Sequence, residues 1–167
     1  AVPRAQLFTG LLAAHFAKRL AEVMFVHVYS GTMDVGKAMA VITTAYASNS
    51  YMTTRLVHAI PVSGFNDAVV QPGILLFVVG QAINAYHHVL LARLRHPRPG
   101  GAGKEKTGRY SVPTGGLFDS TTCPHFFGEL LAWLGLAVVS QHVNVYLLLG
   151  GMTSYLTGRS ISTTRWY

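Results

Sequence analysis

Long stretches without a charged residue dominate the hydrophobic pattern of this chain. No Asp, Glu, Lys or Arg occurs in residues 68–92 or 130–158. A membrane-spanning helix needs about 20 mostly apolar residues, so the first stretch has the length of one span. The second is longer, and Gly150-Gly151 leaves it as either one long span or a span followed by a short turn. Residues 38–54 are also uncharged but rich in Thr, Ser and Tyr, which predicts a weaker span or a helix packed against others.

The stretches and the residues that break them predict a helical chain. We expect helices over residues 3–28, 35–60 and 72–95, another from residue 124, and helix again over 141–156. Pro72 and Pro124 support two of these starts, because proline suits the first turn of a helix. Pro113 and Gly115-Gly116 predict an ordered loop over residues 110–122. The expected fold class is all-α, a polytopic transmembrane bundle of about 4–6 helices that forms a single membrane domain over residues 1–167.

The composition supports burial in a membrane. Half of the residues are hydrophobic and 11% are charged, whereas a soluble domain typically carries about 25% charged residues. The chain therefore has too little charge to cover a water-facing surface in the usual way, and a dry soluble core is the less favoured alternative. One cysteine, Cys123, cannot form an intrachain disulfide. Because the first residue is Ala rather than Met, we expect either a processed mature form or a fragment.

The positive charge is concentrated directly after the helix expected over residues 72–95. The net charge is +7, and the cluster consists of Arg93, Arg95, Arg98, Lys104, Lys106 and Arg109. Membrane proteins carry such residues in short cytoplasmic loops, and a basic cluster can also hold an anionic cofactor or a lipid headgroup. No basic stripe interleaved with aromatic residues accompanies it, which disfavours nucleic acid. We expect membrane lipids and other membrane subunits as partners.

Three of the expected helices each carry a stripe of polar side chains. The stripes are His15, Arg19 and Glu22; Asn84, His88 and Arg95; and His125, Glu129 and Trp133. Ionisable and amide side chains inside membrane spans are costly, so they mark candidate functional sites. One interpretation is that the stripes face one another around a polar pocket the size of a cofactor. The other is that they only satisfy one another through interhelical hydrogen bonds, each worth about 0.6 kcal/mol.

Metal binding and nucleophilic catalysis are both disfavoured by the spacing. The histidines of His87-His88 point to different faces of a helix, and no Cys or carboxylate stands at ligand spacing, so we predict no metal site. Cys123 and His125 are two residues apart at a helix start, which is poor geometry for a nucleophile and its base.

Two motifs carry a family resemblance. They are Tyr110-Ser-Val-Pro-Thr-Gly-Gly-Leu-Phe118 and Cys123-Pro-His-Phe-Phe-Gly-Glu-Leu-Leu-Ala-Trp-Leu-Gly135. They resemble the signature of the steroid 5α-reductase family, a Tyr-x-x-Pro-x-Gly-Gly-Leu-Phe loop followed by a Glu-x-x-x-Trp-x-Gly helix. The earlier stretch from His15 to Ser30 is similar to the very-long-chain enoyl-CoA reductase branch. Gly80 to Asn84 and Arg93 to Arg95 resemble the cofactor helix. The resemblance is to the family's C-terminal domain and covers nearly the whole chain.

The resemblance implies an NADPH-dependent reduction of a carbon–carbon double bond conjugated to a carbonyl. Hydride goes to the β-carbon, and a tyrosine hydroxyl or a carboxyl group stabilises the enolate. By the same resemblance, the NADPH-binding residues are Asn84, Arg95, His125, Glu129, Arg159 and Tyr167. The arginines suit this role because a guanidinium pairs phosphate oxygens bidentately. Apart from what the resemblance implies, Glu129, Glu22, Tyr29 and Tyr110 are the candidate catalytic residues, and the spacing singles out none of them.

The departures from the family pattern affect the catalytic donors above all. Phe16 corresponds to the tyrosine that acts on the carbonyl in steroid reductases, and Phe126 to the tyrosine of the enoyl-CoA branch. Neither phenyl ring can donate a proton, and losing one such donor typically costs two to three orders of magnitude in rate. His88, His125 and Thr163 replace an Asp, an Asn and a His of the family pattern. Complete family members are also longer at both ends.

These observations favour a non-catalytic membrane subunit of a larger complex, for example in the mitochondrial inner membrane. It would be a pseudoenzyme built on a degenerate reductase scaffold, an accessory subunit in which NADPH binding is lost. The alternative is an active NADPH-dependent reductase of an enone C=C bond in the lipid metabolism of the endoplasmic reticulum. Its substrate would be a trans-2-enoyl-CoA or a lipid similar to a 3-oxo-Δ4-steroid. A third hypothesis keeps cofactor or lipid binding without turnover.

Overall fold

The computed structural model describes residues 3–28, 34–59, 64–95 and 112–167, and all statements about structure below concern this part of the chain. Its regular elements are α1 (Arg4–Phe25), α2 (Val35–Val41), the π-helix η1 (Ile42–Ser48), α3 (Asn49–Ala59), the 3-10 helix η2 (Asp67–Val69), α4 (Val70–Arg95), the 3-10 helix η3 (Gly116–Asp119), α5 (Pro124–Ser140) and α6 (Val143–Trp166). The expected all-α class is confirmed.

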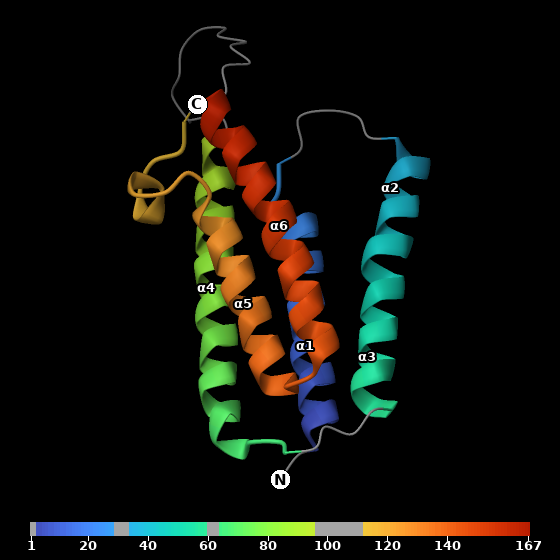
Figure 1. The fold of residues 1–167 in the computed structure, drawn as a ribbon. Helices are drawn as coiled ribbons and strands as arrows, with labels where there is room; N and C mark the ends of the chain where they lie inside the picture. Colours follow the sequence, from blue (N-terminus) through green and yellow to red (C-terminus); the bar gives the residue numbers. More distant parts are fainter. Residues whose placement is uncertain (1–2, 29–33, 60–63, 96–111) are drawn as a thin grey trace, which may run out of the picture.

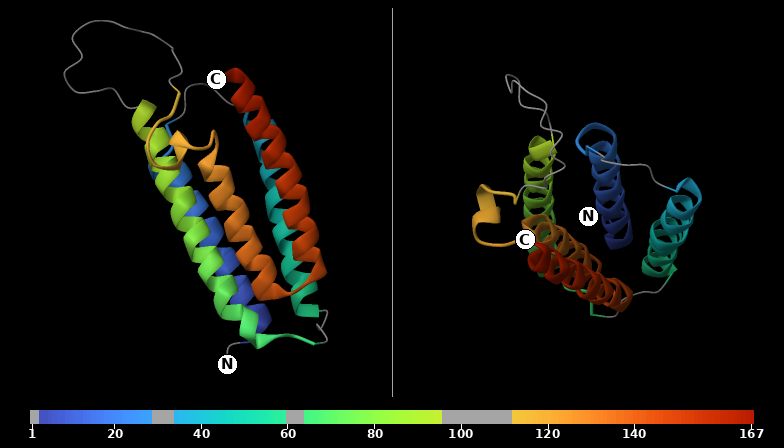
Figure 2. Two further views of the ribbon diagram at one scale, coloured as in Figure 1. Left: turned by 60° about the vertical axis from the view of Figure 1, so that its left-hand side comes forward. Right: turned by 90° about the horizontal axis from the view of Figure 1, so that it is seen from above.

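The helices form an up-and-down bundle (Figure 1). α1, α4 and α6 run in one direction, while the rod made of α2, η1 and α3 runs in the other, as does α5. The most extensive packing is between α4 and α5, and α6 and α1 both lie against α5. Seen from above, the α2–α3 rod stands on the far side of α1 from α4 (Figure 2), where α3 contacts α1 and α6.

Several expected helix limits need correction. The helix expected over residues 35–60 contains the π-helix η1 in its middle. The uncharged stretch 130–158 is neither one long span nor a span ended at the glycine pair. It is divided between α5 and α6, because Gln141 adopts a left-handed conformation with φ of 49°. The helix expected over 141–156 begins at Val143 and continues to Trp166. The expected loop after residue 110 contains η3.

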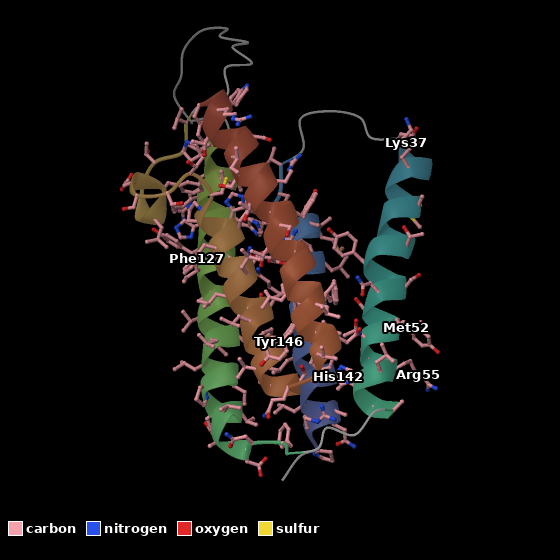
Figure 3. All side chains as sticks on the ribbon, in the orientation of Figure 1. Lys37, Met52, Arg55, Phe127, His142 and Tyr146 are labelled. Atoms are coloured by element: carbon pink, nitrogen blue, oxygen red, sulfur yellow. The ribbon has the colours of Figure 1, made fainter. Side chains whose placement is uncertain are left out.

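Span-length helices are fewer than the hydrophobic pattern suggested. Within the described ranges, one helical segment is long and apolar enough to cross a membrane. It covers residues 67–94, which are η2 together with most of α4, and α5 is a shorter apolar helix. Figure 3 shows Met52 and Arg55 on the outer side of α3, turned away from the other helices. The interior of the bundle therefore lies on the side of α1, α5 and α6, and the outer side of the rod is exposed.

Small residues allow α4 and α5 to pack in close contact. A Cβ atom on Gly80 would lie 2.4 Å from the backbone nitrogen of Ala132, and one on Gly128 would lie 2.6 Å from that of Asn84. The same crowding occurs at Gly73 and Gly135. Glycine at these places brings two helix backbones together, which is how helices associate when lipid removes the hydrophobic drive between them. This close contact at Gly73, Gly80, Gly128 and Gly135 is here called the α4–α5 seam. It determines where the polar side chains of α4 and α5 lie.

A hydrogen-bonded junction closes the bundle at the end opposite the C-terminus. Arg4 donates from Nη1 to the carbonyl oxygen of Ser140 at 2.6 Å and from Nη2 to that of Val57 at 3.4 Å. One side chain therefore joins α1 to the ends of α3 and α5. The buried core above it consists of Phe8, Leu12, Val57, Phe77, Ala132, Trp133, Leu136, Ala137 and Val145.

The corner between α5 and α6 is also held by side chains. Gln141 accepts from the backbone N–H of Asn66 at 3.0 Å and donates to its carbonyl oxygen at 2.8 Å. His142 caps α6, because its Nδ1 accepts from the backbone N–H of Asn144 at 3.2 Å. Burial lowers the pKa of His142, and the positive charge of Arg4 lowers it further. The neutral ring required by the cap is therefore the favoured form.

Candidate functional site

The structure gathers polar side chains from α1, α4 and α5 into one group, here called the interhelical polar cluster. Its members are His15, Lys18, Arg19, Glu22, Gln81, Asn84, His88, His125, Glu129 and Trp133. The three stripes predicted from helical spacing thus lie together. The exception is Arg95, which ends α4 but whose side chain is outside the described part of the structure.

Glu22 is the centre of the charge arrangement. Its carboxylate lies 2.9 Å from Lys18 Nζ, 3.1 Å from Arg19 Nη1 and 3.0 Å from His88 Nδ1. Lys18 and Arg19 are one helical turn before Glu22, so α1 supplies both cations and the anion from one face. The side chain of Glu22 is buried, and its charge is balanced by these partners. As a candidate catalytic acid Glu22 is therefore unsuitable, because this arrangement stabilises its ionised form.

Asn84 joins all three helices of the site. Its Oδ1 accepts a hydrogen bond from Lys18 Nζ of α1, and its Nδ2 donates to the backbone carbonyl oxygen of His125 on α5 at 2.8 Å. The side chain is buried. Asn84 was expected to bind the cofactor, but in this conformation both ends of its amide are engaged with protein atoms. Its observed contribution is to set the positions of α1 and α5 relative to α4.

His15 contacts three other members of the cluster, Gln81, Glu129 and Trp133. Its Nδ1 is 2.7 Å from Gln81 Nε2, and its Nε2 is 3.4 Å from Glu129 Oε1. Its ring also meets Trp133 edge-on, with ring centres 5.5 Å apart. Because Gln81 donates to Nδ1, the proton of the neutral ring lies on Nε2 and points toward Glu129. Glu129 on α5 therefore faces His15 on α1. Helical spacing within α5 did not predict this partner.

Four buried polar atoms of the cluster have no hydrogen-bond partner among the described residues, and one of them, Glu22 Oε1, is ion-paired with Lys18. The other three are Gln81 Oε1, His125 Nδ1 and Trp133 Nε1. Most buried polar side-chain atoms in proteins are hydrogen-bonded, so such an atom calls for a bound molecule or water. The three atoms offer both a donor and acceptors, and the partly exposed cations Lys18 and Arg19 stand beside them. These unpaired atoms can bond to a polar ligand, and the positive charge beside them favours an anionic one.

A set of potential metal ligands lies at the edge of the cluster. One ligand atom each from Glu22, His27 and His88 lies within 4.8 Å of the others. The adjacent pair His87-His88 in the sequence does not indicate this group. Arg19 Nη1, however, is 3.1 Å from Glu22 Oε2 and 3.4 Å from His88 Nδ1. A guanidinium thus already supplies positive charge to the atoms that a metal would need. We assign Glu22 and His88 to the ion-pair network, with the ring of His27 in contact with that of His88.

His87 attaches the η3 turn to α4. Its Nδ1 lies 2.7 Å from the carbonyl oxygen of Ile83, and its Nε2 accepts from the backbone N–H of Leu117 at 3.1 Å. The ring therefore carries its proton on Nδ1. Gly116, with φ of 58°, leaves little room for a side chain, since a Cβ there would lie 2.8 Å from the ring of Tyr86 and 3.1 Å from His87 Nε2. The glycine-rich loop is thereby held close to the start of α5.

Arg159 and Tyr167 lie near the C-terminal end of α6, an element that contributes no residue to the polar cluster. Tyr167 lines a cavity of about 220 Å³ together with Pro113, Phe118 and Thr122. Arg159 lines a second cavity, of about 270 Å³, with Ser162 and Trp166. Partial burial raises the pKa of the Tyr167 phenol, so it remains a hydrogen-bond donor at neutral pH. The structure does not bring these two expected cofactor residues together with Asn84 and Glu129.

The two phenylalanines at the expected donor positions line the cluster. Phe16 meets the ring of His15 edge-on at 5.1 Å between ring centres, and Phe126 lies 4.3 Å from the ring centre of His125. Both side chains therefore occupy the site, where they supply apolar surface and no hydrogen-bond donor. The remaining candidate catalytic residues, Tyr29 and Tyr110, lie outside the described residues.

Sequence reasoning missed Gln81, Lys18 and His87. Gln81 and Lys18 were not assigned to a stripe, although Gln81 precedes His88 by seven residues, two turns of a helix. His87 was read only as half of a histidine pair. Its role depends on the position of Leu117, thirty residues away along the chain, which helical spacing cannot indicate.

Comparison with known proteins gives matches over most of the chain. The sequence model of a family described as 3-oxo-5-alpha-steroid 4-dehydrogenase matches residues 21–167. A very-long-chain enoyl-CoA reductase of Dictyostelium discoideum is 25% identical over 85% of this chain and 45% of its own length. The 3-oxo-5-alpha-steroid 4-dehydrogenase 1 of Homo sapiens is 30% identical over 84% of this chain and 54% of its own. The chain thus spans about half of the length of these curated relatives.

Proposed function

Because this chain belongs to the 3-oxo-5-alpha-steroid 4-dehydrogenase family, whose members use NADPH, we propose that it is an NADPH-dependent reductase. Its substrate would be a membrane lipid with a carbon–carbon double bond conjugated to a carbonyl, either a trans-2-enoyl-CoA or a 3-oxo-Δ4-steroid-like lipid. The family consists of integral membrane reductases of the endoplasmic reticulum, and we propose the same setting and a polytopic topology here.

The observation that carries this proposal is the set of unsatisfied atoms in the interhelical polar cluster. A purely structural cluster would satisfy its own buried groups, yet Gln81 Oε1, His125 Nδ1 and Trp133 Nε1 lack partners among the described residues. Leaving a buried donor or acceptor unpaired costs about 1–3 kcal/mol. A ligand that pairs these atoms would recover that free energy on binding, and the residues would discriminate against a molecule unable to pair them.

NADPH, when bound, supplies a hydride for the β-carbon of the double bond. The side chains of this protein would bind and orient the cofactor and substrate. Lys18 and Arg19 are suited to phosphate oxygens, because each combines positive charge with hydrogen-bond donors. The apolar rings of Phe16 and Phe126 exclude water beside the cluster. We further propose that Arg95, Arg159 and Tyr167 contribute to cofactor binding from the C-terminal ends of α4 and α6.

Titration of the detergent-purified protein with NADPH, followed by cofactor fluorescence, tests this function. We expect micromolar binding that Arg19→Ala and Arg95→Ala weaken at least tenfold. Arg55→Ala is the matched control, because Arg55 lies on the outer side of α3, away from the cluster (Figure 3), and should leave binding unchanged. Enone reduction by the wild-type protein would then be followed by NADPH oxidation. Absence of binding at millimolar cofactor would refute the proposal.

A non-catalytic subunit of a larger membrane complex is the second candidate. Phe16 and Phe126 favour it, since neither ring can supply the hydrogen bond that stabilises an enolate. On this hypothesis the polar cluster only joins α1, α4 and α5, and the protein works as an accessory subunit in a membrane such as the mitochondrial inner membrane. Stoichiometric co-purification with several other membrane subunits, together with no NADPH binding, is the result expected for this role and not for the reductase.

A further inference from the structure

Reduction of an enone places negative charge on the carbonyl oxygen, so a reductase needs a hydrogen-bond donor at that oxygen. The two carboxylates of the polar cluster are poor candidates. Glu22 accepts from Lys18 and Arg19, and Glu129 faces the Nε2 of His15, so both are placed as acceptors. Phe16 and Phe126 have no donor. Within the cluster, Trp133 Nε1 is a buried donor, and Lys18 and Arg19 are ion-paired with Glu22. An exposed hydroxyl lies on an element next to the cluster.

A continuous series of aromatic rings leads from the cluster to a phenol. The ring of Trp133 on α5 meets His15 at 5.5 Å, and His15 meets Phe16 at 5.1 Å, both in edge-to-face contact. Phe16 in turn meets Tyr46 of η1 at 6.4 Å with an interplanar angle of 89°. Aromatic pairs favour this geometry, which fixes ring orientation. Phe16, which lies between Tyr46 and His15 of the polar cluster, thus positions the Tyr46 ring.

The element that carries Tyr46 has an unusual backbone. η1 is seven residues of π-helix inserted between α2 and α3. π-helical segments are rare and occur frequently at functional sites, because the additional residue changes the direction of the side chains around it. Tyr46 is 54% exposed although its ring contacts Phe16. Tyr46 is therefore accessible to a ligand although its ring lies against Phe16.

We propose that Tyr46 is the hydrogen-bond donor to the carbonyl oxygen of the substrate, an inference that rests on the proposed reductase function. As hydride adds to the β-carbon, the electron pair of the C=C bond forms a double bond between the α-carbon and the carbonyl carbon. The C=O π pair moves to oxygen, where the Tyr46 O–H stabilises the enolate and keeps its own proton. A proton from water then adds to the α-carbon and restores the carbonyl, while NADPH ends as NADP⁺.

Tyr46→Phe is the test variant and Tyr86→Phe is its matched control. Tyr86 is nearly as exposed, at 53%, and it also contacts one aromatic ring, that of His87. It lies two residues from Asn84 on α4, which places it on the opposite side of that helix from the cluster. Both substitutions remove one hydroxyl and keep the ring. We expect Tyr46→Phe to lower the rate of enone reduction about 100- to 1,000-fold, and Tyr86→Phe to leave it unchanged.

A second readout does not require turnover. A 3-oxo-Δ4-steroid and a trans-2-enoyl-CoA, each with a ¹³C-labelled carbonyl, would be bound to the full chain in detergent without cofactor. In the infrared spectrum, hydrogen bonding from Tyr46 lowers the C=O stretching frequency of the ligand. We expect that lowering in the wild-type protein and in Tyr86→Phe, and its loss in Tyr46→Phe.

The two readouts separate this inference from the reductase proposal. If the wild-type protein binds NADPH and reduces the enone, but Tyr46→Phe matches Tyr86→Phe in rate and spectrum, the reductase function stands and the role of Tyr46 is overturned. If the wild-type protein does not bind NADPH, the reductase function fails. The infrared shift then still decides whether Tyr46 contacts the carbonyl: its loss in Tyr46→Phe supports the contact, and an unchanged spectrum overturns it.

Discussion

Substitution of Gly80 by alanine tests whether the α4–α5 seam holds the candidate site together. The new Cβ would lie 2.4 Å from the backbone nitrogen of Ala132 and 2.7 Å from the carbonyl oxygen of Gly128. Both are backbone atoms, which cannot rotate away as a flexible side chain can. Ordinary contact begins at 3.4 Å, so the two helices must separate by about 1 Å.

The expected loss of stability is about 1–3 kcal/mol. Overpacking of this kind costs about 1–3 kcal/mol. Separation of the helices also breaks the 2.8 Å hydrogen bond from Asn84 to the carbonyl oxygen of His125, at about 0.6 kcal/mol in a membrane bundle. The higher helix propensity of alanine returns up to about 1 kcal/mol. For a chain of this size, the net change lowers Tm by roughly 2–10 °C.

Gly150→Ala provides the matched control, because no atom lies within 4 Å of a Cβ at Gly150 in α6. Alanine there gains helix propensity without a clash, so Tm should stay the same or rise by a few degrees. Thermal unfolding in detergent, followed by loss of the monodisperse size-exclusion peak, measures both variants. The close-packing argument fails if Gly80→Ala is as stable as Gly150→Ala. NADPH affinity should fall in Gly80→Ala, since the seam positions the polar cluster.

Three further outcomes are expected. His87→Phe keeps a ring but removes the acceptor for the Leu117 N–H. Hydrogen exchange of the backbone amides in residues 112–122, measured by mass spectrometry, should become at least tenfold faster. Unchanged exchange would contradict the attachment of η3 to α4. Arg4→Met keeps the aliphatic stem but loses the hydrogen bonds to the carbonyl groups of Ser140 and Val57. The loss should lower the free energy of unfolding by about 1–2 kcal/mol. A Tm equal to that of the wild type would show that this junction between α1, α3 and α5 is dispensable. Burial lowers the pKa of His142 in the folded state, so the unfolded chain binds the proton more readily and stability should decline as the pH falls below about 6.5. His142→Asn can still cap α6 without titrating there, and its Tm should fall less between pH 8 and pH 5; equal declines would exclude His142 as the cause.

Helical spacing anticipated much of the candidate site. Residues four apart on a helix share a face, so the stripes containing His15, Asn84 and Glu129 could be assigned without coordinates. It did not indicate that Asn84 uses both ends of its amide to join α1 and α5. Hydrogen bonds between helices depend on the register of one helix against another, and residues distant in sequence set that register.

The role of the C-terminal candidates in cofactor binding stays a prediction. Arg159 and Tyr167 line separate cavities at the end of α6. Motif matching assigns each residue a role on the assumption that the elements are packed in one particular way. For Arg159 and Tyr167, that packing depends on the length and direction of α6, which begins only after the left-handed turn at Gln141.

By itself, the sequence determined the all-α class, most of the helices and the faces that carry polar groups, because composition, apolar length and helical periodicity are local properties. Only the tertiary structure decided which groups meet. It paired Glu22 with His88, attached η3 through His87 and brought Tyr46 against Phe16. Each of these contacts depends on a close approach between separate helices, set by packing along their whole length, and no pattern within a single helix contains that information.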